Sequence, residues 1–472
     1  MKKSMNLQRK QKTEYTGLTT CKKVEPSNTS KMLSKELMLS NRERVNDESS
    51  DTSNLMEKVV SYTNMKLAID RVIKNKGSHG VDGMKTDELL GHINKHWYSS
   101  IKIKLLDGTY KPSPVRRVEI PKQDGGIRLL GIPTVLDRTI QQAIAQVLTP
   151  IYEDIFSDSS YGFRPNRDAK KAILKAKQYI NEGNKYVVDM DLEKFFDKVN
   201  HDILMNKLGQ RVKDKRLLEL IRKYLKSGIM TNGVQLCSDE GTPQGGPLSP
   251  LLANIMLDEM DKELEARGHK FCRYADDCNI YVKSARAGER VMESMIKLLE
   301  GKLKLKVNRN KSAVNLVSRR KFLGFSFYFT KGGAEIKIHE KSYRRFRAKI
   351  REVTNRNKGI SMESRLIKLN QITIGWLNYY SIAKGKSRIR ELEGWIRRRL
   401  RACIWKTWKR VRTRYKNLIK AGIPKYKAWE FANTRKGYWR ISNSPVLSKS
   451  LTNTYLAELG FISISKRYQM IH

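Results

Sequence analysis

The spacing of apolar residues changes along this chain of 472 residues and divides it into regions. Residues 1–50 are rich in Lys, Ser, Thr and Asn and have little apolar periodicity, which predicts a mobile basic tail. From Met65 the apolar residues recur at helical intervals, and Gly77 predicts the end of that helix. Between about 110 and 330 strand and helix patterns alternate, and from about 340 the pattern is almost wholly helical. This mixture predicts an α+β fold of two or three domains.

Five short segments between residues 118 and 282 have the composition of strands. They are residues 118–120, 127–130, 186–191, 271–274 and 278–282. The first two flank a glycine-containing turn at 122–126 and predict a hairpin. The third predicts a strand that leads into a helical segment, and the last two predict strands joined by a tight turn. A glycine-rich stretch at 241–247 precedes residues 248–257, which predict a buried helix.

Basic residues and tryptophans alternate between residues 391 and 420, where eleven Lys and Arg accompany two Glu. A stripe of apolar residues follows helical spacing there, and we expect it to be core and not a base-stacking platform. The stripe consists of Leu400, Ile404, Trp408, Val411 and Tyr415. The neighbouring arginines at 397–399 and 401 do not fit on one helix face, so some of them are expected to reach phosphates. A solvated basic face without a ligand is the alternative.

Charge and cysteine content narrow the function classes. The chain has 94 Lys and Arg against 48 Asp and Glu, a net charge of +46, which favours a polyanionic partner such as nucleic acid. The five cysteines form no C-x-x-C pair, which argues against a disulfide framework or a zinc site. No apolar run is long enough to cross a membrane, and no signal peptide is evident. We therefore expect a soluble, cytoplasmic protein associated with nucleic acid and not with a membrane.

Two adjacent aspartates, Asp276 and Asp277, stand in the predicted turn between the last two strands. Carboxylates this close repel each other and favour a divalent cation, for which Mg2+ is the hard, oxygen-seeking choice. A solvated turn is the alternative, because Asp is common in turns. Phosphoryl transfer by two ions requires a further carboxylate. Asp189 and Asp191 are the candidates, and since strand side chains alternate, both point to one side and spacing does not choose between them.

The order of several motifs resembles that of the reverse transcriptases encoded by group II introns. The matching pieces are Asp191 with Phe196, residues 161–165 (YGFRP), 243–245 (PQG), 274–277 (YADD), 375–380 (GWLNYY) and 395–400 (WIRRRL). Each is weak alone, and their order makes them specific. The resemblance is nearest to the compact, group IIC-like members, and it implies a right-hand polymerase of fingers, palm and thumb with an antiparallel palm sheet and a helical thumb or maturase region.

The resemblance also implies roles for single residues in the metal site. It makes Asp191, Asp276 and Asp277 the carboxylates that bind two Mg2+ ions, with the backbone carbonyl of Leu192 as a further ligand. It assigns Asp189 a structural role.

The same resemblance places the dNTP substrate. It assigns the triphosphate to Lys122 and Arg128 in the predicted hairpin, and it makes Phe196 the steric gate against a ribonucleotide 2′-hydroxyl. Gln244 and Gly245 lie under the nascent base pair, and Lys311 supports the pocket. From the residues alone, surface charges, a core phenylalanine and a plain loop remain alternatives.

The implied domains are a basic tail (1–50), an amino-terminal extension of the fingers (51–110), fingers and palm (111–332), thumb (333–400) and a basic nucleic-acid-binding region (401–472). Intron RNA as template and a DNA primer or target are the implied partners, and splicing assistance is the implied second activity. The end of the chain has no cluster of His and Cys resembling an HNH endonuclease. The alternatives are a maturase that only binds RNA and a domesticated reverse transcriptase in defence or DNA repair.

Overall fold

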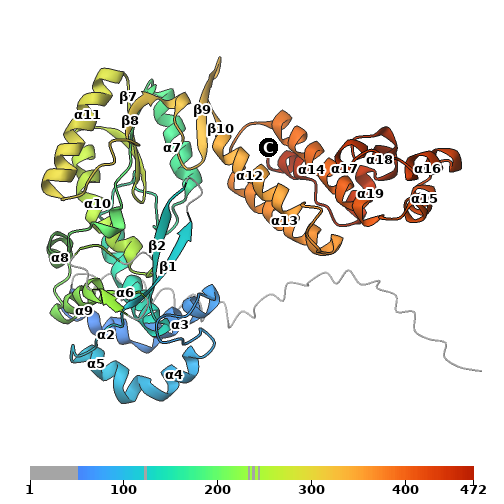
Figure 1. Ribbon diagram of the computed structural model, residues 1–472. Coiled ribbons are helices and arrows are strands. Elements are labelled where there is room, and N and C mark those ends of the chain that lie inside the picture. Colours follow the sequence, from blue (N-terminus) through green and yellow to red (C-terminus); the bar gives the residue numbers. More distant parts are fainter. Residues whose placement is uncertain (1–50, 122–124, 232–233, 237–239, 243–244) are drawn as a thin grey trace, which may run out of the picture. The chain divides into compact units, whose positions relative to one another are not determined.

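The computed structural model describes residues 51–472 with the exception of 122–124, 232–233, 237–239 and 243–244. The predictions for the tail and for Lys122 and Gln244 fall outside these residues. The chain consists of two units, Met1–Thr52 and Ser53–His472, and the helices and strands given below belong to the second unit. Figure 1 shows its helices and strands along the sequence.

The first part of this unit is helical. It contains α2 (Leu55–Val60), α3 (Tyr62–Asn75), α4 (Leu89–His96), the π-helical turn η1 (Trp97–Ile101) and α5 (Lys102–Leu106). The helix predicted from Met65 is α3, which packs on α6 (Val135–Glu153). It ends next to Lys76, whose left-handed φ of 47° closes the helix one residue before the predicted Gly77.

The predicted hairpin is formed by β1 (Val115–Pro121) and β2 (Ile127–Ile132), whose register pairs Ile120 with Arg128. β1 also pairs in parallel with β4 (Ile229–Thr231), and β4 pairs with β5 (Val234–Leu236). The sheet order is β2-β1-β4-β5.

A second sheet of four antiparallel strands has the order β6-β7-β3-β8. Its strands are β3 (Tyr186–Met190), β6 (Lys270–Tyr274), β7 (Asp277–Val282) and β8 (Ala313–Leu316). The three strand segments predicted between 186 and 282 are therefore confirmed, as is the tight turn between the last two. The register places Met190 opposite Cys278 and Tyr274 opposite Asp277.

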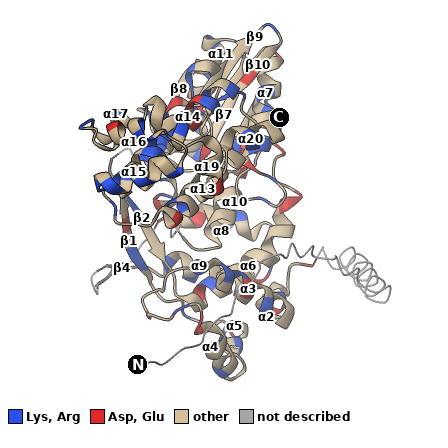
Figure 2. Ribbon diagram, turned by 90° about the vertical axis from the view of Figure 1, so that its right-hand side faces the viewer, with Lys and Arg blue, Asp and Glu red and all other residues tan. Residues whose placement is uncertain are grey.

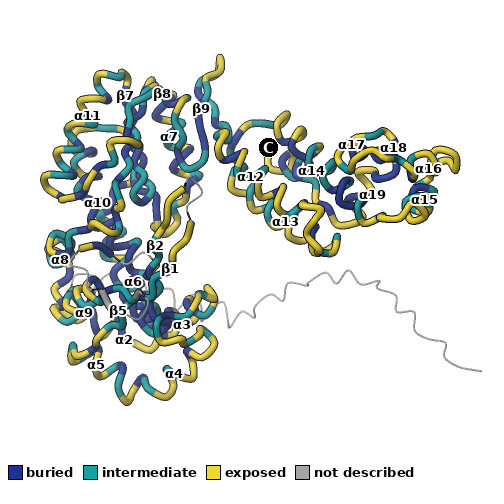
Figure 3. The backbone as a smooth tube through the Cα atoms, viewed as in Figure 1, coloured by how far each residue is buried: buried dark blue, intermediate teal, exposed yellow. Residues whose placement is uncertain are grey.

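Both faces of this second sheet are covered. Val187 and Tyr281 belong to a core shared with α7 (Ala169–Asn181). Val188 and Ile280 belong to a larger core shared with α10 (Ser249–Ala266) and α11 (Ala285–Lys297). Successive strand residues point to opposite faces, which explains why strands such as β7 are buried almost throughout (Figure 3).

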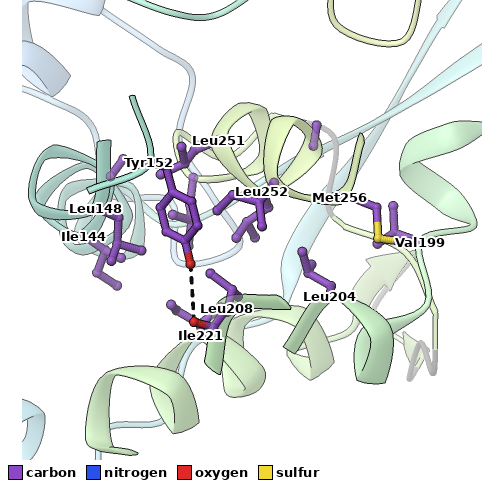
Figure 4. Packing of buried hydrophobic residues seen from close by; sticks show 14 of the residues in the cluster. Ile144, Leu148, Tyr152, Val199, Leu204, Leu208, Ile221, Leu251, Leu252 and Met256 are labelled. Carbon is purple, nitrogen blue, oxygen red and sulfur yellow. Dashed lines mark hydrogen bonds between the residues drawn. The ribbon is translucent and has the colours of Figure 1, made fainter. Parts of the chain in front are cut away.

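The larger core extends beneath the helices that follow the sheet strands. α8 (His201–Gly209) and α9 (Lys215–Lys226) pack there with α6 and α10. The predicted buried helix at 248–257 is confirmed as the first half of α10. Figure 4 shows the apolar side chains around Tyr152, whose hydroxyl donates to the carbonyl oxygen of Leu208 at 3.3 Å. Helices α6, α8, α9 and α10 therefore share one hydrophobic core.

The segment after β3 differs from the predicted helix. It forms a single 3-10 turn, Phe195–Asp197, preceded by Lys194 in the left-handed region at φ 48°. A regular helix begins only at His201, where the Asn200 side chain accepts the N–H of Ile203. A 3-10 turn and then the separate helix α8 therefore stand where one helix was predicted.

From residue 325 onward a hairpin leads into helices with a separate core. The hairpin is β9 (Phe325–Thr330) and β10 (Gly333–Ile338). The helices are α12 (Glu340–Val353), α13 (Met362–Tyr379), α14 (Lys386–Thr407), α15 (Val411–Lys420), α16 (Lys425–Ala432), α17 (Tyr438–Ile441), α18 (Pro445–Ser450), α19 (Asn453–Glu458) and α20 (Ile464–Ile471). The helical pattern predicted from about 340 is confirmed.

The apolar stripe predicted over residues 400–415 is not one continuous helix. Leu400 and Ile404 are buried in α14. This helix ends at Thr407, and α15 begins at Val411, which is exposed. The Nε–H of Arg414 donates to the carbonyl oxygen of Trp408 at 3.0 Å and so satisfies a carbonyl just past the end of α14. The core prediction is right for the first part of the stripe and wrong at Val411.

Candidate active site

The turn between β6 and β7 carries two half-buried carboxylates, Asp276 and Asp277. Ala275 gives the turn its shape with a left-handed φ of 59°. The third carboxylate, Asp191, follows the end of β3, whose last residue pairs with Cys278 beside the turn. Antiparallel pairing thus brings together residues that lie about 85 positions apart in the chain.

Asp191 and Asp276 line one cavity of about 1130 Å³, which we call the acidic cavity. Leu192, Phe196 and Arg128 also line it, as does Lys311, whose Nζ lies 3.6 Å from Oδ2 of Asp191. Most of the described residues that the sequence associates with metal or dNTP therefore surround one space. Asp277 is not among the residues that line it.

Burial and neighbouring carboxylates raise the pKa values of Asp276 and Asp277. Burial raises the pKa of Asp276, with a further contribution from Asp191, while Arg128 opposes the rise. Burial, followed by repulsion from Asp189 and Asp276, raises the pKa of Asp277 to about 8. A carboxyl group with this pKa holds its proton at neutral pH unless a cation replaces it. The negative charge of the ionised carboxylates is therefore not fully balanced by the basic residues around the site.

The donor set has the chemistry that Mg2+ requires, since carboxylates and a backbone carbonyl are oxygen ligands. The mutual repulsion of the carboxylates is the feature that a divalent cation relieves. Among the residues that the structure describes, no three His, Cys, Asp or Glu side chains are grouped as a metal site. The residues fit the ion in their chemistry.

Asp189 is held by a partner of its own. Nε of Arg320 donates to Oδ2 of Asp189 at 2.8 Å, and Nη2 of the same arginine contacts the same oxygen and the carbonyl oxygen of Lys311. Asp189 is therefore committed to an ion pair, while Asp191 faces the acidic cavity. The sequence does not single out Arg320 among so many basic residues, because its partner lies 131 positions away.

A second cavity of about 500 Å³ adjoins the site through shared residues Arg128 and Phe196. Gly245 lines it with a φ of 129°, and a Cβ atom at this position would lie 2.6 Å from the carbonyl oxygen of Gly131. Only glycine fits there without strain.

Contacts within the protein hold both the backbone and the ring of Phe196. The N–H of Thr242 donates to the carbonyl oxygen of Phe196 at 2.6 Å, and the rings of Phe195 and Phe196 meet edge to face at 5.2 Å. Sequence patterns do not identify Thr242 as a site residue, although it lies in the glycine-rich stretch at 241–247, which they do identify. The ring of Phe196 is thereby held at the wall shared by the two cavities.

Lys and Arg are frequent on α14, α15 and α16 (Figure 2). The four arginines at 397–399 and 401 nevertheless make contacts within the protein. Arg397 pairs with Glu393, Arg398 stacks 3.9 Å from the Trp439 ring centroid, and Arg399 and Arg401 donate to Thr354 and to the carbonyl oxygen of Leu451. Their side chains point in different directions, as their spacing predicts, and each also helps to hold the helical region together. Across the part of the chain that the structure describes, no helix has the length and apolarity to cross a membrane.

Two family models match the chain. Residues 120–327 match the family "Reverse transcriptase (RNA-dependent DNA polymerase)", and residues 343–422 match "Group II intron, maturase-specific domain". The first match contains the second sheet and most residues that line the acidic cavity, and the second contains most of α12 and all of α13, α14 and α15. The two matches correspond to the two structural regions.

Curated relatives agree with these matches. Protein YkfC of Escherichia coli is 35% identical over 282 residues, which cover 51% of this chain and 74% of that protein. The group II intron-encoded protein LtrA of Lactococcus lactis is 39% identical over 213 residues, which cover 44% of this chain and 34% of LtrA. The putative COX1/OXI3 intron 2 protein of Saccharomyces cerevisiae is 34% identical over 272 residues, covering 56% of this chain and 31% of that protein.

Among solved structures, a chain of a partial Cas6-RT-Cas1--Cas2 complex is 29% identical, with a TM-score of 0.35, and the match covers 54% of this chain and 43% of that one. The alignments span about a third of LtrA and of the yeast protein but most of YkfC. From the family matches and the curated relatives we conclude that this chain belongs to the group II intron-encoded reverse transcriptases, RNA-dependent DNA polymerases that carry a maturase-specific domain.

Proposed function

We propose that the acidic cavity is the polymerase site of a right-hand enzyme that copies intron RNA into DNA. The observation that carries this proposal is the cavity itself, where Asp191 and Asp276 meet Arg128 and Phe196. In this assignment residues 51–110 extend the fingers, 111–332 form fingers and palm, 333–400 form the thumb, and 401–472 form a basic nucleic-acid-binding region. The second sheet is the palm sheet.

In the proposed site Asp191, Asp276 and Asp277 hold two Mg2+ ions, with the carbonyl of Leu192 as a further ligand. The pKa values of Asp276 and Asp277, raised by burial and further by neighbouring carboxylates, support this role, because binding of a cation favours the ionised carboxylates. When bound, such a pair of ions activates an attacking hydroxyl and stabilises a leaving phosphate. Lys311 lies near Asp191 and limits the net negative charge of the site before metal and substrate bind.

The reaction joins a DNA primer to an incoming nucleotide. The 3′-oxygen of the primer forms a bond to the α-phosphorus of a dNTP, the hydroxyl proton is lost, and the bond to the departing pyrophosphate breaks. Arg128, together with Lys122, is proposed to bind the triphosphate. Phe196 excludes a 2′-hydroxyl, and Gln244 and Gly245 lie beneath the new base pair.

The maturase-specific domain supplies the second part of the proposal. The helical region is proposed to bind the intron RNA that encodes the chain and to assist its splicing. Its excess of Lys and Arg supports binding to phosphates, and the two family matches support the combination of both domains in one protein. A DNA target for insertion of the intron is the further partner proposed.

Primer extension on an RNA template tests the polymerase assignment. We expect Asp276→Asn to abolish extension, because it removes a carboxylate from the cavity while keeping the shape of the side chain. Asp87→Asn is the matched control, since this carboxylate is exposed and outside the site. RNA binding by both variants should equal that of the unchanged chain. Normal extension by Asp276→Asn would refute the assignment, whereas no extension by any form, with tight RNA binding, would favour a maturase that only binds RNA.

A further inference from the structure

The shape of the turn before Asp276 depends on an unusual backbone conformation. Ala275 has a φ of 59°, in the left-handed region that residues with a Cβ atom rarely adopt. Its carbonyl oxygen accepts a hydrogen bond from Nη1 of Arg273 at 3.0 Å. Because this carbonyl belongs to the peptide that joins Ala275 to Asp276, its orientation governs where the following carboxylates point.

Arg273 is fully buried, and each of its five guanidinium N–H groups has an acceptor in reach. Nε lies 2.7 Å and 2.9 Å from the two carboxylate oxygens of Asp261, and Nη2 also reaches this carboxylate. Nη1 donates to Oδ1 of Asn254 at 2.9 Å as well as to Ala275, and Nη2 donates to Oγ of Ser160 at 2.8 Å. The guanidinium is thus fixed in position and in rotation.

The backbone around Arg273 is joined to a second sequence motif, residues 161–165. The N–H of Tyr161 donates to the carbonyl oxygen of Arg273, and the N–H of Arg273 donates to that of Ser159, both at 2.8 Å. Gly162 lies so close to the turn that a Cβ atom there would be 2.3 Å from the backbone nitrogen of Ala275. The two motifs are therefore parts of one rigid unit, which explains why a small residue stands at position 162.

Stability alone does not account for this buried ion pair. Arg273 and Asp261 are both completely inaccessible, and burial raises the pKa of Asp261 against the effect of the arginine. Replacing such a pair by apolar residues of similar volume is often neutral or stabilising. An apolar side chain at position 273 would, however, leave the Ala275 carbonyl without its donor. The geometry of the turn is what the pair uniquely supplies.

We propose that Arg273, anchored by Asp261, is a positioning residue for DNA synthesis: it holds the left-handed turn at Ala275 so that Asp276 and Asp277 point toward the metal and substrate. This inference rests on the proposed function of those two carboxylates. Arg273 touches neither substrate nor metal, and it acts through the Ala275 carbonyl. Asn254 extends the same support by donating to the carbonyl oxygen of Gly162 at 2.9 Å.

The main test is Arg273→Lys, which keeps the charge but lacks the fork that serves Asp261 and Ala275 together. We expect kcat for primer extension to fall about 100-fold, because a displacement near 1 Å costs roughly that factor. The Mg2+ concentration needed for half-maximal rate should rise, while the KM for dNTP and the affinity for RNA stay nearly unchanged. Arg216→Lys is the control, since Arg216 pairs with buried Asp214 away from the turn, and its kcat should not change.

A second substitution separates positioning from general support of the fold. In the double variant Arg273→Lys with Ala275→Gly, glycine adopts the left-handed conformation without steric cost, so the turn needs less support. We expect about a tenfold recovery of kcat compared with Arg273→Lys, measured against Ala275→Gly alone. A loss due only to a weakened core would not be recovered. If Arg273→Lys does not fold, Gly162→Ala displaces the turn with the guanidinium intact and should lower kcat in the same way.

The outcomes are distinct. Unchanged kcat and Mg2+ dependence in folded Arg273→Lys, or a loss that Ala275→Gly does not recover, would overturn the positioning role. Asp276→Asn in the same assay keeps the underlying function separate. If Asp276→Asn is inactive while Arg273→Lys is fully active, only the positioning role fails, whereas an active Asp276→Asn removes the proposed function of the site.

Discussion

The sheet-based region and the helical region of this chain treat their charges differently. In the sheet-based region the buried Arg273 is matched by a buried Asp261, and Arg320 is matched by Asp189. In the helical region Arg397 also pairs with the buried carboxylate of Glu393, but Arg398 lies on the ring of Trp439, and three arginines surround the ring of Trp395. Paired charges hold carboxylates in place, whereas arginines on rings and carbonyls leave the region with a positive excess. The first arrangement suits chemistry on a phosphate, and the second suits binding of a polyanion.

The largest effect is expected at the acidic cavity. Asp191→Asn should lower the rate of primer extension by about 10³-fold or more, and combining it with Asp276→Asn should add little, because residues that act as one unit are not additive. Primer extension with Mg2+ measures both. If the two losses multiply, the carboxylates do not act together.

Truncation of a buried side chain in the helical region should lower the free energy of unfolding without lowering the rate of primer extension per folded molecule. Trp405 is 1% exposed, and Trp405→Ala is expected to cost about 3–5 kcal/mol of unfolding free energy in urea. Trp429→Ala is the matched control, because that ring is 60% exposed and its loss should stay within about 0.5 kcal/mol. Equal losses in both variants would contradict the described core.

The steric role proposed for Phe196 predicts a change in substrate choice. Phe196→Ala opens the wall of the acidic cavity, and we expect discrimination against ribonucleotides to relax by up to about 100-fold. The ratio of kcat/KM for a dNTP and the matching rNTP measures the effect. Phe195→Ala serves as a comparison, because that ring is buried and also lines the acidic cavity but, unlike Phe196, does not line the second cavity. If Phe195→Ala relaxes the ratio as much, the effect is not steric exclusion by Phe196.

The positive excess of the helical region should appear in the salt dependence of RNA binding. Arg412 and Lys416 are exposed on α15, and replacing both by Ala should reduce the slope of log K against log salt by about 1.4, or roughly 0.7 for each phosphate contact. Lys66 and Lys74 on α3 are exposed as well and provide a charge-matched control. An equal change in both double variants would mean that net charge, and not the helical region, determines binding.

The smallest expected effect concerns Glu335 on β10. The carboxylate of Glu335 forms ion pairs with Lys177 and Lys384. Hydrogen bonds from these lysines lower the pKa of Glu335 below its usual 4.5. The ionised form is therefore favoured in the folded state, so its stabilisation is present above pH 4.5 and is lost as pH falls through the lowered value. Glu335→Gln should remove this pH dependence and cost less than about 1 kcal/mol at pH 7. Unfolding in urea at several pH values tests it, and an unchanged acid dependence would contradict it.

The strands and the turn that carry Asp276 and Asp277 were predictable, because alternation and turn chemistry are local properties. The same holds for the hairpin of β1 and β2 and for α10. The single helix expected after β3 and the continuous stripe through Val411 were not correct. Asn200 caps the start of α8, so the regular helix begins later than predicted, and Arg414 satisfies a carbonyl just past the end of α14, where the predicted stripe is interrupted.

The sequence by itself determined the mixed fold class, the order of the catalytic motifs and the positive charge of the chain, since each depends on residue type and on short-range spacing. Spacing left Asp189 and Asp191 equivalent, and the family resemblance assigned the metal to Asp191; the tertiary structure adds that Asp189 pairs with Arg320. It likewise joined residues 161–165 to the turn at Ala275 through Arg273. These outcomes depend on contacts between residues more than 100 positions apart, and the pairing of strands, which no local pattern encodes, creates them.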